Sequence, residues 1–340
     1  MVEIYFGLTE KHIENFETII LHKGKNDKIT QRILITDKNS NNSKFWDKII
    51  YSNASFLQKG NNIAQDFYFM IKKIMSYKKI INKIKIHKNE SEIRIYLAYI
   101  EDILSNYLFF HFHEEPEVVI VEDGLLNYYD HTFKNVNKKR FYMKKMLASL
   151  FNIKYSKYQG HSSGIEYEKS KMQFLSLPDL AFIPKKVQPL PIKEILINQP
   201  ENHLYIIGQE NLIQIIGLSN YKKIFFKFID DLVEYISTFE IYIIYYKPRN
   251  KSLDFEIEYL QKAFSNFKVV ILANNLMAEE EYFKNIRSRY VASMISSALL
   301  TIYSKVSNRK SRGIEFIYKP IWDDKISILF EKLNFTKLVD

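Results

Sequence analysis

Two carboxylates and a glycine follow a strongly apolar segment in "VVIVEDGLLNYYD", residues 118–130. Its β-branched residues predict a buried strand that ends at Glu122, Asp123 and Gly124. The carboxyl ends of parallel strands are where α/β enzymes place their reactive groups. A carboxylate at such a position can accept a proton from a hydroxyl group. A plain turn with solvated acids is the alternative interpretation.

Three further segments place polar residues where a strand ends or a helix begins. The apolar segment "LYIIGQ" ends in Gly208-Gln209, and "EIYIIYYKPR" ends in Lys247-Pro248-Arg249. Ser296-Ser297 precede the predicted helix in "VASMISSALLTIY". Serine hydroxyls and backbone N–H groups at a helix start bind phosphate, and a cation neutralises a departing phosphate. The set therefore suits a phosphorylated sugar donor, although an ordinary helix cap and an exposed turn remain open.

Several other chemistries are not expected. The chain lacks the glycine-rich phosphate loop, the dinucleotide fingerprint and the serine-nucleophile motif, and it has only nine glycines. His111 and His113 are two residues apart, which does not place both rings on one helical face, so we expect no metal site. The absence of cysteine excludes disulfides and thiolate ligands and fits a reducing cytoplasm.

Alternating strands and helices must position these residues. Predicted strands at 2–6, 32–37, 93–99 and 117–123 are separated by helices, one capped by Thr9 and another over 62–80 with Phe67 and Met75 among its core residues. A second series has strands at 203–209, 239–248 and 267–273, helices near 220–237, 252–264 and 278–287, and a short strand entering a helix within 289–304. Such alternation predicts parallel sheets.

Five of the eight prolines lie between residues 178 and 200, which predicts an interdomain connection. The fold prediction is therefore α/β with two Rossmann-like domains, 1–185 and 186–340. This organisation is typical of the GT-B fold, in which the ligand lies between the two halves.

The formal net charge is +10, and two segments, 72–88 and 134–145, are rich in lysine and lack acids. They are either solvated helix faces or a surface for an anionic partner. No apolar run is long enough for a membrane helix, and "MVEIYFGLTE" has no secretory signal pattern.

Four motifs in order, "VEDGLLNYY", "YIIGQ", "IYYKPRN" and "VASMISSALLTIY", resemble those of the bacterial sialyltransferases. The resemblance includes the lipooligosaccharide sialyltransferases and, more distantly, the capsule polysialyltransferases. Residues 95–104 and the opening strand, loop and helix are also similar to that family.

The resemblance implies inverting, metal-independent transfer of sialic acid, or a related nonulosonic acid, from a CMP-linked donor. The acceptor would be a glycan or glycolipid of bacterial lipooligosaccharide or capsule. The implied location is the bacterial cytoplasm, peripheral on the inner membrane, with 72–88 and 134–145 toward anionic lipid. Nucleic acid is not an expected partner.

The resemblance also assigns roles to individual residues. The family's histidine falls at Lys247, whose cation can stabilise a departing phosphate. Where some members have an Asp after the Gly-Gln strand, this chain has only Glu210 nearby, so Glu122 or Asp123 is the predicted base. The resemblance places the donor phosphate near Lys247, Pro248, Arg249, Ser296 and Ser297, and the cytidine near Gly208-Gln209. It therefore implies that domain 186–340 binds the nucleotide-sugar donor and domain 1–185 the acceptor.

Two alternatives remain open. A GT-B glycosyltransferase that uses another nucleotide sugar, such as a hexose donor, is favoured by the lysine at 247. A non-catalytic polyanion-binding protein is favoured by the net charge and by the lysine runs.

Overall fold

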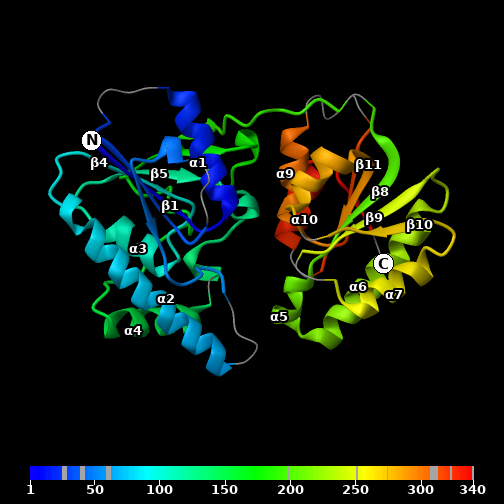
Figure 1. Ribbon diagram of the computed structural model, residues 1–340, viewed down its shortest axis with the longest axis horizontal. Coiled ribbons are helices and arrows are strands. Elements are labelled where there is room, and N and C mark those ends of the chain that lie inside the picture. The colour runs from blue at the N-terminus through cyan, green and yellow to red at the C-terminus, as the bar shows by residue number, and fades with distance from the viewer. Residues whose placement is uncertain are drawn as a thin grey trace. The chain divides into compact units, whose positions relative to one another are not determined.

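The computed structural model describes residues 1–24, 29–38, 43–58, 63–135, 137–197, 199–249, 252–273, 275–306, 313–321 and 324–338. The chain divides into two compact units, Met1–Ile192 and Lys193–Asp340. Each unit is an α/β domain with one parallel sheet (Figure 1).

The first unit contains a seven-stranded parallel sheet of order β3-β2-β1-β4-β5-β6-β7. Its strands are β1 Val2–Gly7, β2 Gln31–Thr36, β3 Lys48–Tyr51, β4 Ile93–Leu97, β5 Glu117–Val121, β6 Ser170–Leu175 and β7 Val187–Pro189. Its α-helices are α1 Glu10–Lys23, α2 Ile63–Ile84, α3 Ile103–Phe110 and α4 Lys138–Leu150. Short 3₁₀ turns lie at Ser43–Phe45, Lys85–His87, Gly124–Tyr128, Phe133–Asn135 and Pro178–Leu180.

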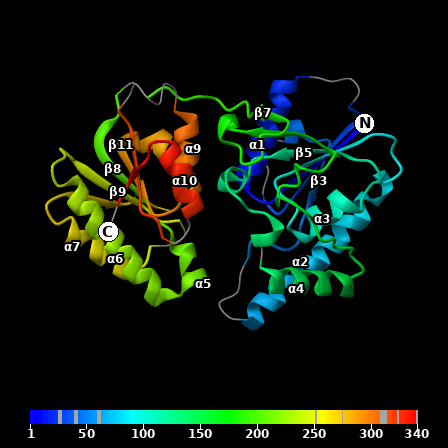
Figure 2. The same cartoon turned by 180° about the vertical axis from the view of Figure 1, so that it is seen from behind.

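Strand alternation divides the core of this unit into two layers. Ile4 and Phe6 of β1 point to the face that α2 and α3 cover, while Tyr5 points to the face that α1 covers. Figure 2 shows α2, α3 and α4 grouped together, with α1 apart from them. The sheet is therefore buried on both faces, as doubly wound sheets are.

The second unit contains a six-stranded parallel sheet of order β10-β9-β8-β11-β12-β13. Its strands are β8 Glu201–Ile207, β9 Ile243–Lys247, β10 Lys268–Ile271, β11 Ser288–Ser293, β12 Glu315–Tyr318 and β13 Thr336–Lys337. Its helices are α5 Ile213–Ile216, α6 Leu218–Ile236, α7 Asp254–Ala263, α8 Ala278–Glu281, α9 Ser297–Lys305 and α10 Asp324–Lys332, with a 3₁₀ turn at Glu210–Leu212 and a π-helical turn at Tyr282–Ile286. Helices α6 and α7 pack on one face through residues such as Phe225 and Leu260.

The predicted order of strands and helices is confirmed wherever the periodicity was strong. Thr9 caps α1 by accepting a hydrogen bond from the backbone N–H of His12 at 3.1 Å. The core prediction for α2 is wrong at Phe67 and Met75, which are 49% and 47% exposed. The same prediction is confirmed at Ile74, which is buried, and the helix also turns Tyr77 toward the sheet.

The unit boundary lies after Ile192 rather than after residue 185. Residues 187–189 form β7, which pairs with β6 and so belongs to the first sheet. Prolines at 189 and 191 mark the end of this edge strand, where the missing N–H of proline is tolerated.

Candidate functional site

Both sheets reverse their strand order next to their first strand. The switch point lies between β1 and β4 in the first unit and between β8 and β11 in the second. In open α/β sheets, ligands bind beyond the carboxyl ends of the strands at such a point. The predicted site residues follow β5, β8, β9 and β11, so all of them lie at the carboxyl edges of the two sheets.

Glu122 and Asp123, at the end of β5, lie in different environments. Glu122 is 5% exposed, and its Oε2 accepts hydrogen bonds from the Tyr128 hydroxyl and the Ser176 backbone N–H, both at 2.5 Å. Burial raises the pKa of this carboxyl against those hydrogen bonds. Glu122 therefore links the loop after β6 to the end of β5, and Asp123 is the more exposed of the two carboxylates.

The Asp123 side chain reaches solvent and is held by a histidine. It is 27% exposed, and its Oδ1 lies 2.7 Å from Nε2 of His12. The Leu8 backbone N–H donates to Nδ1 of His12 at 3.3 Å, so the imidazole proton lies on Nε2 and is donated to Asp123. None of the described residues donates a hydrogen bond to the other oxygen of Asp123, Oδ2. That oxygen can accept a proton from a bound hydroxyl group.

The sequence interpretation missed His12. It lies in the first turn of α1, directly after β1, and is 2% exposed. A histidine in "TEKHIENF", just beyond the strand next to the switch point, was the available signal. Its partner at β5 is 111 positions away, which no local pattern reveals.

A charged cluster lies beside the same switch point, after β4. Glu101 accepts hydrogen bonds from His131 at 3.2 Å and from Lys144 at 3.3 Å. Burial opposes the charged form, but these two partners outweigh it and lower the pKa of Glu101 to about 2. Within the described ranges, no group of three His, Asp or Glu side chains could hold a metal ion.

In the second unit, Gly208 is required by the packing around Glu210. A Cβ at Gly208 would lie 2.2 Å from Oε1 of Glu210 and 2.7 Å from the Tyr246 hydroxyl. Glu210 is 6% exposed and accepts hydrogen bonds from the Tyr246 hydroxyl at 2.8 Å and from the Arg249 backbone N–H at 2.7 Å. The Glu210 carboxylate therefore connects the ends of β8 and β9. The adjoining Gln209 is buried.

Lys247 points away from solvent. It is 1% exposed, and its Nζ donates to the backbone carbonyl of Ala273 at 2.6 Å. Burial lowers its pKa, opposed by Glu281 and Glu210. As placed, the ammonium links the ends of β9 and β10, which differs from the predicted contact with a donor phosphate. Pro248 is buried beside it, while Arg249 is exposed.

The two serines before α9 also differ. Ser296 is 4% exposed and caps the helix, because its hydroxyl oxygen accepts from the Ala298 backbone N–H at 3.2 Å. The interpretation of Ser296 as an ordinary helix cap is therefore confirmed. Ser297 is exposed at the first helical position. The buried Ser293 hydroxyl donates to the carbonyl of Ile207 at 2.9 Å and holds β11 against β8.

No protein-family model matches the sequence, and no curated protein matches it either. Among solved structures, a protein assigned as a UDP-N-acetylglucosamine 2-epimerase from Listeria monocytogenes superposes with a TM-score of 0.51 at 10% identity, covering 93% of this chain and 78% of that one. UGT2 of Phytolacca americana, complexed with UDP-2-fluoro-glucose and pterostilbene, gives 0.50 at 8% identity and covers 99% and 85%. The predicted fold class is confirmed: the chain has a GT-B-like α/β fold with two Rossmann-like sheets.

Proposed function

We propose that this protein is an inverting glycosyltransferase that transfers a sugar from a nucleotide-linked donor to a glycan acceptor. The observation that carries the proposal is the Asp123 carboxylate at the carboxyl edge of the first sheet. It reaches solvent, and His12 holds it in place at 2.7 Å. A positioned carboxylate of this kind is the general base that such a transfer needs.

In the proposed reaction, Oδ2 of Asp123 takes the proton from an acceptor hydroxyl. The hydroxyl oxygen then forms a bond to the anomeric carbon of the donor sugar. The bond between that carbon and the phosphate oxygen breaks, and the nucleotide leaves with the electron pair. His12 acts as a positioning residue, because its Nε2–H fixes Asp123 and stabilises the carboxylate before the proton arrives.

The second unit binds the donor in this proposal. Ser297 and the backbone N–H groups at the start of α9 receive the phosphate, helped by the helix dipole and by the exposed Arg249. The nucleoside binds at the carboxyl end of β8, next to Gly208-Gln209. Lys247 supports the end of β9 through its hydrogen bond to the Ala273 carbonyl.

A CMP-linked nonulosonic acid is the donor that the order of the four motifs supports. A UDP-linked sugar is the second candidate, because the Phytolacca enzyme of similar fold is complexed with a UDP-sugar analogue. The transfer needs no metal in this scheme, since Asp123 supplies the base and Arg249 and α9 supply the positive charge.

We further propose that the acceptor is presented at an anionic membrane surface, on the cytoplasmic side of a bacterial inner membrane. On α4, Tyr142, Met146 and Leu150 recur every four residues and are 59%, 59% and 71% exposed. The exposed Lys138, Lys139, Arg140 and Lys145 lie on the same helix, which has no acid. Exposed apolar and basic residues together are typical of helices that lie on anionic lipid. No described helix is long and apolar enough to cross a membrane.

Two measurements test the proposed function. In calorimetric titration with CMP, UMP, GDP and ADP, preference for CMP supports the nonulosonic donor and preference for UMP supports the UDP-sugar donor. Binding of none of the four overturns the proposal in favour of polyanion binding without catalysis.

The second measurement is the rate of nucleotide release from the preferred donor. Asp123→Asn should lower kcat by a factor of about 100 or more while leaving nucleotide affinity unchanged. Asp179→Asn, which changes an exposed carboxylate of the same unit, is the matched control. Activity of Asp123→Asn equal to that of the control contradicts the assignment of the base.

A further inference from the structure

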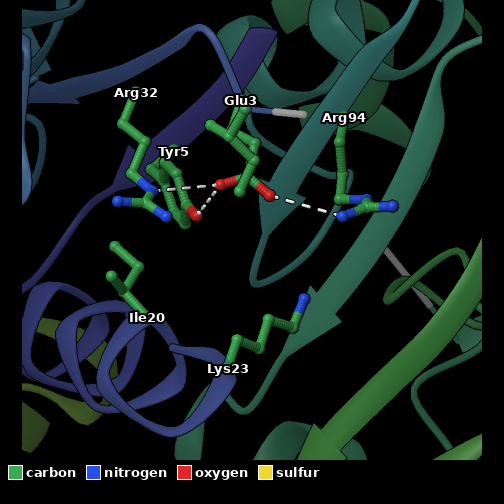
Figure 3. Close-up of a pocket in the computed structure, with 7 residues that line it drawn as sticks. Glu3, Tyr5, Ile20, Lys23, Arg32 and Arg94 are labelled. Carbon is green, nitrogen blue, oxygen red and sulfur yellow. Dashed lines mark hydrogen bonds and ion pairs between the residues drawn. The ribbon is translucent and has the colours of Figure 1, made fainter. Parts of the chain in front are cut away.

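A basic cavity lies near the amino ends of the first sheet, on the face that α1 covers, away from the carboxyl-edge site. Glu3, Arg32 and Arg94 are register neighbours on β1, β2 and β4, and the end of α1 contributes Lys23. Tyr5, Ile20 and Ile29 complete the lining, and the cavity volume is about 240 Å³. This is below the roughly 300–1,000 Å³ of sites for drug-sized ligands, so the cavity suits a small ion. Figure 3 shows the cationic side chains around this space.

Among the described lining residues, the acidic one already has four donors around it. Glu3 is 1% exposed and accepts from the hydroxyls of Tyr5 at 2.6 Å and Tyr96 at 2.9 Å. Arg32 and Arg94 each add a contact at 3.4 Å. Burial raises the pKa of both tyrosines, so they keep their protons and donate to Glu3. These four groups therefore offset the negative charge of Glu3, which reduces its repulsion of an anion in the cavity.

Cationic donors remain after these contacts. Arg94 is further neutralised by Glu117, at 2.6 Å and 2.9 Å. Arg32 uses only its Nε toward Glu3, and no described residue accepts a hydrogen bond from its two terminal nitrogens. Lys23 donates to the Tyr96 hydroxyl at 2.9 Å and has no carboxylate within 4.0 Å among the described side chains. Burial and the adjacent Arg94 lower the pKa of Lys23, and a bound anion would offset both effects.

We propose that this cavity binds a phosphate group, held between the Lys23 ammonium and the terminal nitrogens of Arg32. The planar guanidinium of arginine and the compact ammonium of lysine both donate charged hydrogen bonds to phosphate oxygens. The ligand is either free inorganic phosphate or the phosphate of a small phosphomonoester. The proposal is independent of the proposed transfer, because none of its residues belongs to the carboxyl-edge site.

Calorimetric titration of the full chain with sodium phosphate, at constant ionic strength and against sodium chloride, tests the proposal. We expect saturable binding that becomes about tenfold weaker or more in Lys23→Met and in Arg32→Gln, since each removes a charged hydrogen bond. Lys79→Met is the matched control. It removes one exposed lysine from α2, which packs on the other face of the sheet, and should bind phosphate as the wild type does.

A parallel titration with glucose 6-phosphate separates the two sources of phosphate. Tighter binding than that of inorganic phosphate indicates a phosphomonoester, and equal or weaker binding indicates the free anion. The proposal is overturned if the wild type shows no saturable phosphate binding. It is equally overturned if Lys23→Met and Arg32→Gln, each folded by circular dichroism, bind phosphate as tightly as Lys79→Met does, because the phosphate then lies elsewhere.

Discussion

The packing around Gly208 leads to a quantitative prediction for Gly208→Ala. The new methyl group would displace the Glu210 carboxylate, which lies 2.2 Å from the Cβ position, and press on the Tyr246 hydroxyl at 2.7 Å. Glu210 would lose one or both of its hydrogen bonds, at 2.8 Å and 2.7 Å, while remaining almost fully buried. A hydrogen bond to a charged group contributes about 1.5–3 kcal/mol, so we expect a loss of about 3 kcal/mol in the free energy of unfolding.

A double-mutant cycle with Glu210→Ala isolates this cause. Once the Glu210 side chain is removed, the closest clash is gone, and adding Gly208→Ala should cost at least about 1 kcal/mol less than it does in the wild type. The assay is urea denaturation followed by far-ultraviolet circular dichroism on all four proteins. The reasoning would be refuted if the free energy of unfolding of Gly208→Ala lay within about 0.5 kcal/mol of the wild-type value. It would also be refuted if the effects of the two substitutions on that free energy were strictly additive.

Three other predictions concern pH and local contacts. Burial raises the pKa of Glu256 from 4.5 to about 7. The free energy of unfolding of the wild type should therefore fall by up to about 3 kcal/mol as pH rises through that interval. In denaturation measured from pH 4.5 to 8, Glu256→Gln should abolish this pH dependence. The pKa of Glu101 is lowered from 4.5 to about 2, so its carboxylate stabilises the fold fully above pH 4.5. Glu101→Gln should lower the free energy of unfolding by about 3 kcal/mol at pH 7, and the difference from the wild type should shrink as pH falls toward 2. His12→Ala should lower kcat about tenfold at unchanged KM, because Asp123 loses the hydrogen bond that holds its carboxylate in position. An unchanged kcat would show that His12 does not position Asp123.

Most of the fold was predictable because parallel strands buried on both faces are continuous apolar runs. Strands such as β5 and β8 stand out in this way. The strands that were missed are short or lie toward the sheet edges, as β3 and β7 do, and a segment of three or four residues is too short to show a strand pattern. Phe67 and Met75 were misassigned because apolar residues occur on both sides of α2, so composition did not reveal its buried face.

The candidate site was predictable in position but less so in its contacts. Strand ends identified Asp123, Gly208 and Ser297, because the carboxyl edge of a parallel sheet follows from strand order. Burial decides the roles of Glu122 and Lys247, and burial depends on distant partners such as Ser176 and Ala273. No spacing rule connects residues that meet only after the sheet has formed.

The strand order that creates the two switch points also has a consequence for folding. Strands 1, 2 and 3 of each sheet pair with their sequence neighbours, whereas β4 must return to β1, and β11 to β8, across long stretches of chain. Closing those loops carries the largest entropic cost of any pairing near the centre of each sheet, and such non-local pairings slow folding. We therefore expect the β1–β4 and β8–β11 pairings to form late, after the shorter crossover connections between sequence neighbours have formed. A destabilised chain would then lose these two central pairings before it loses most of its helical content.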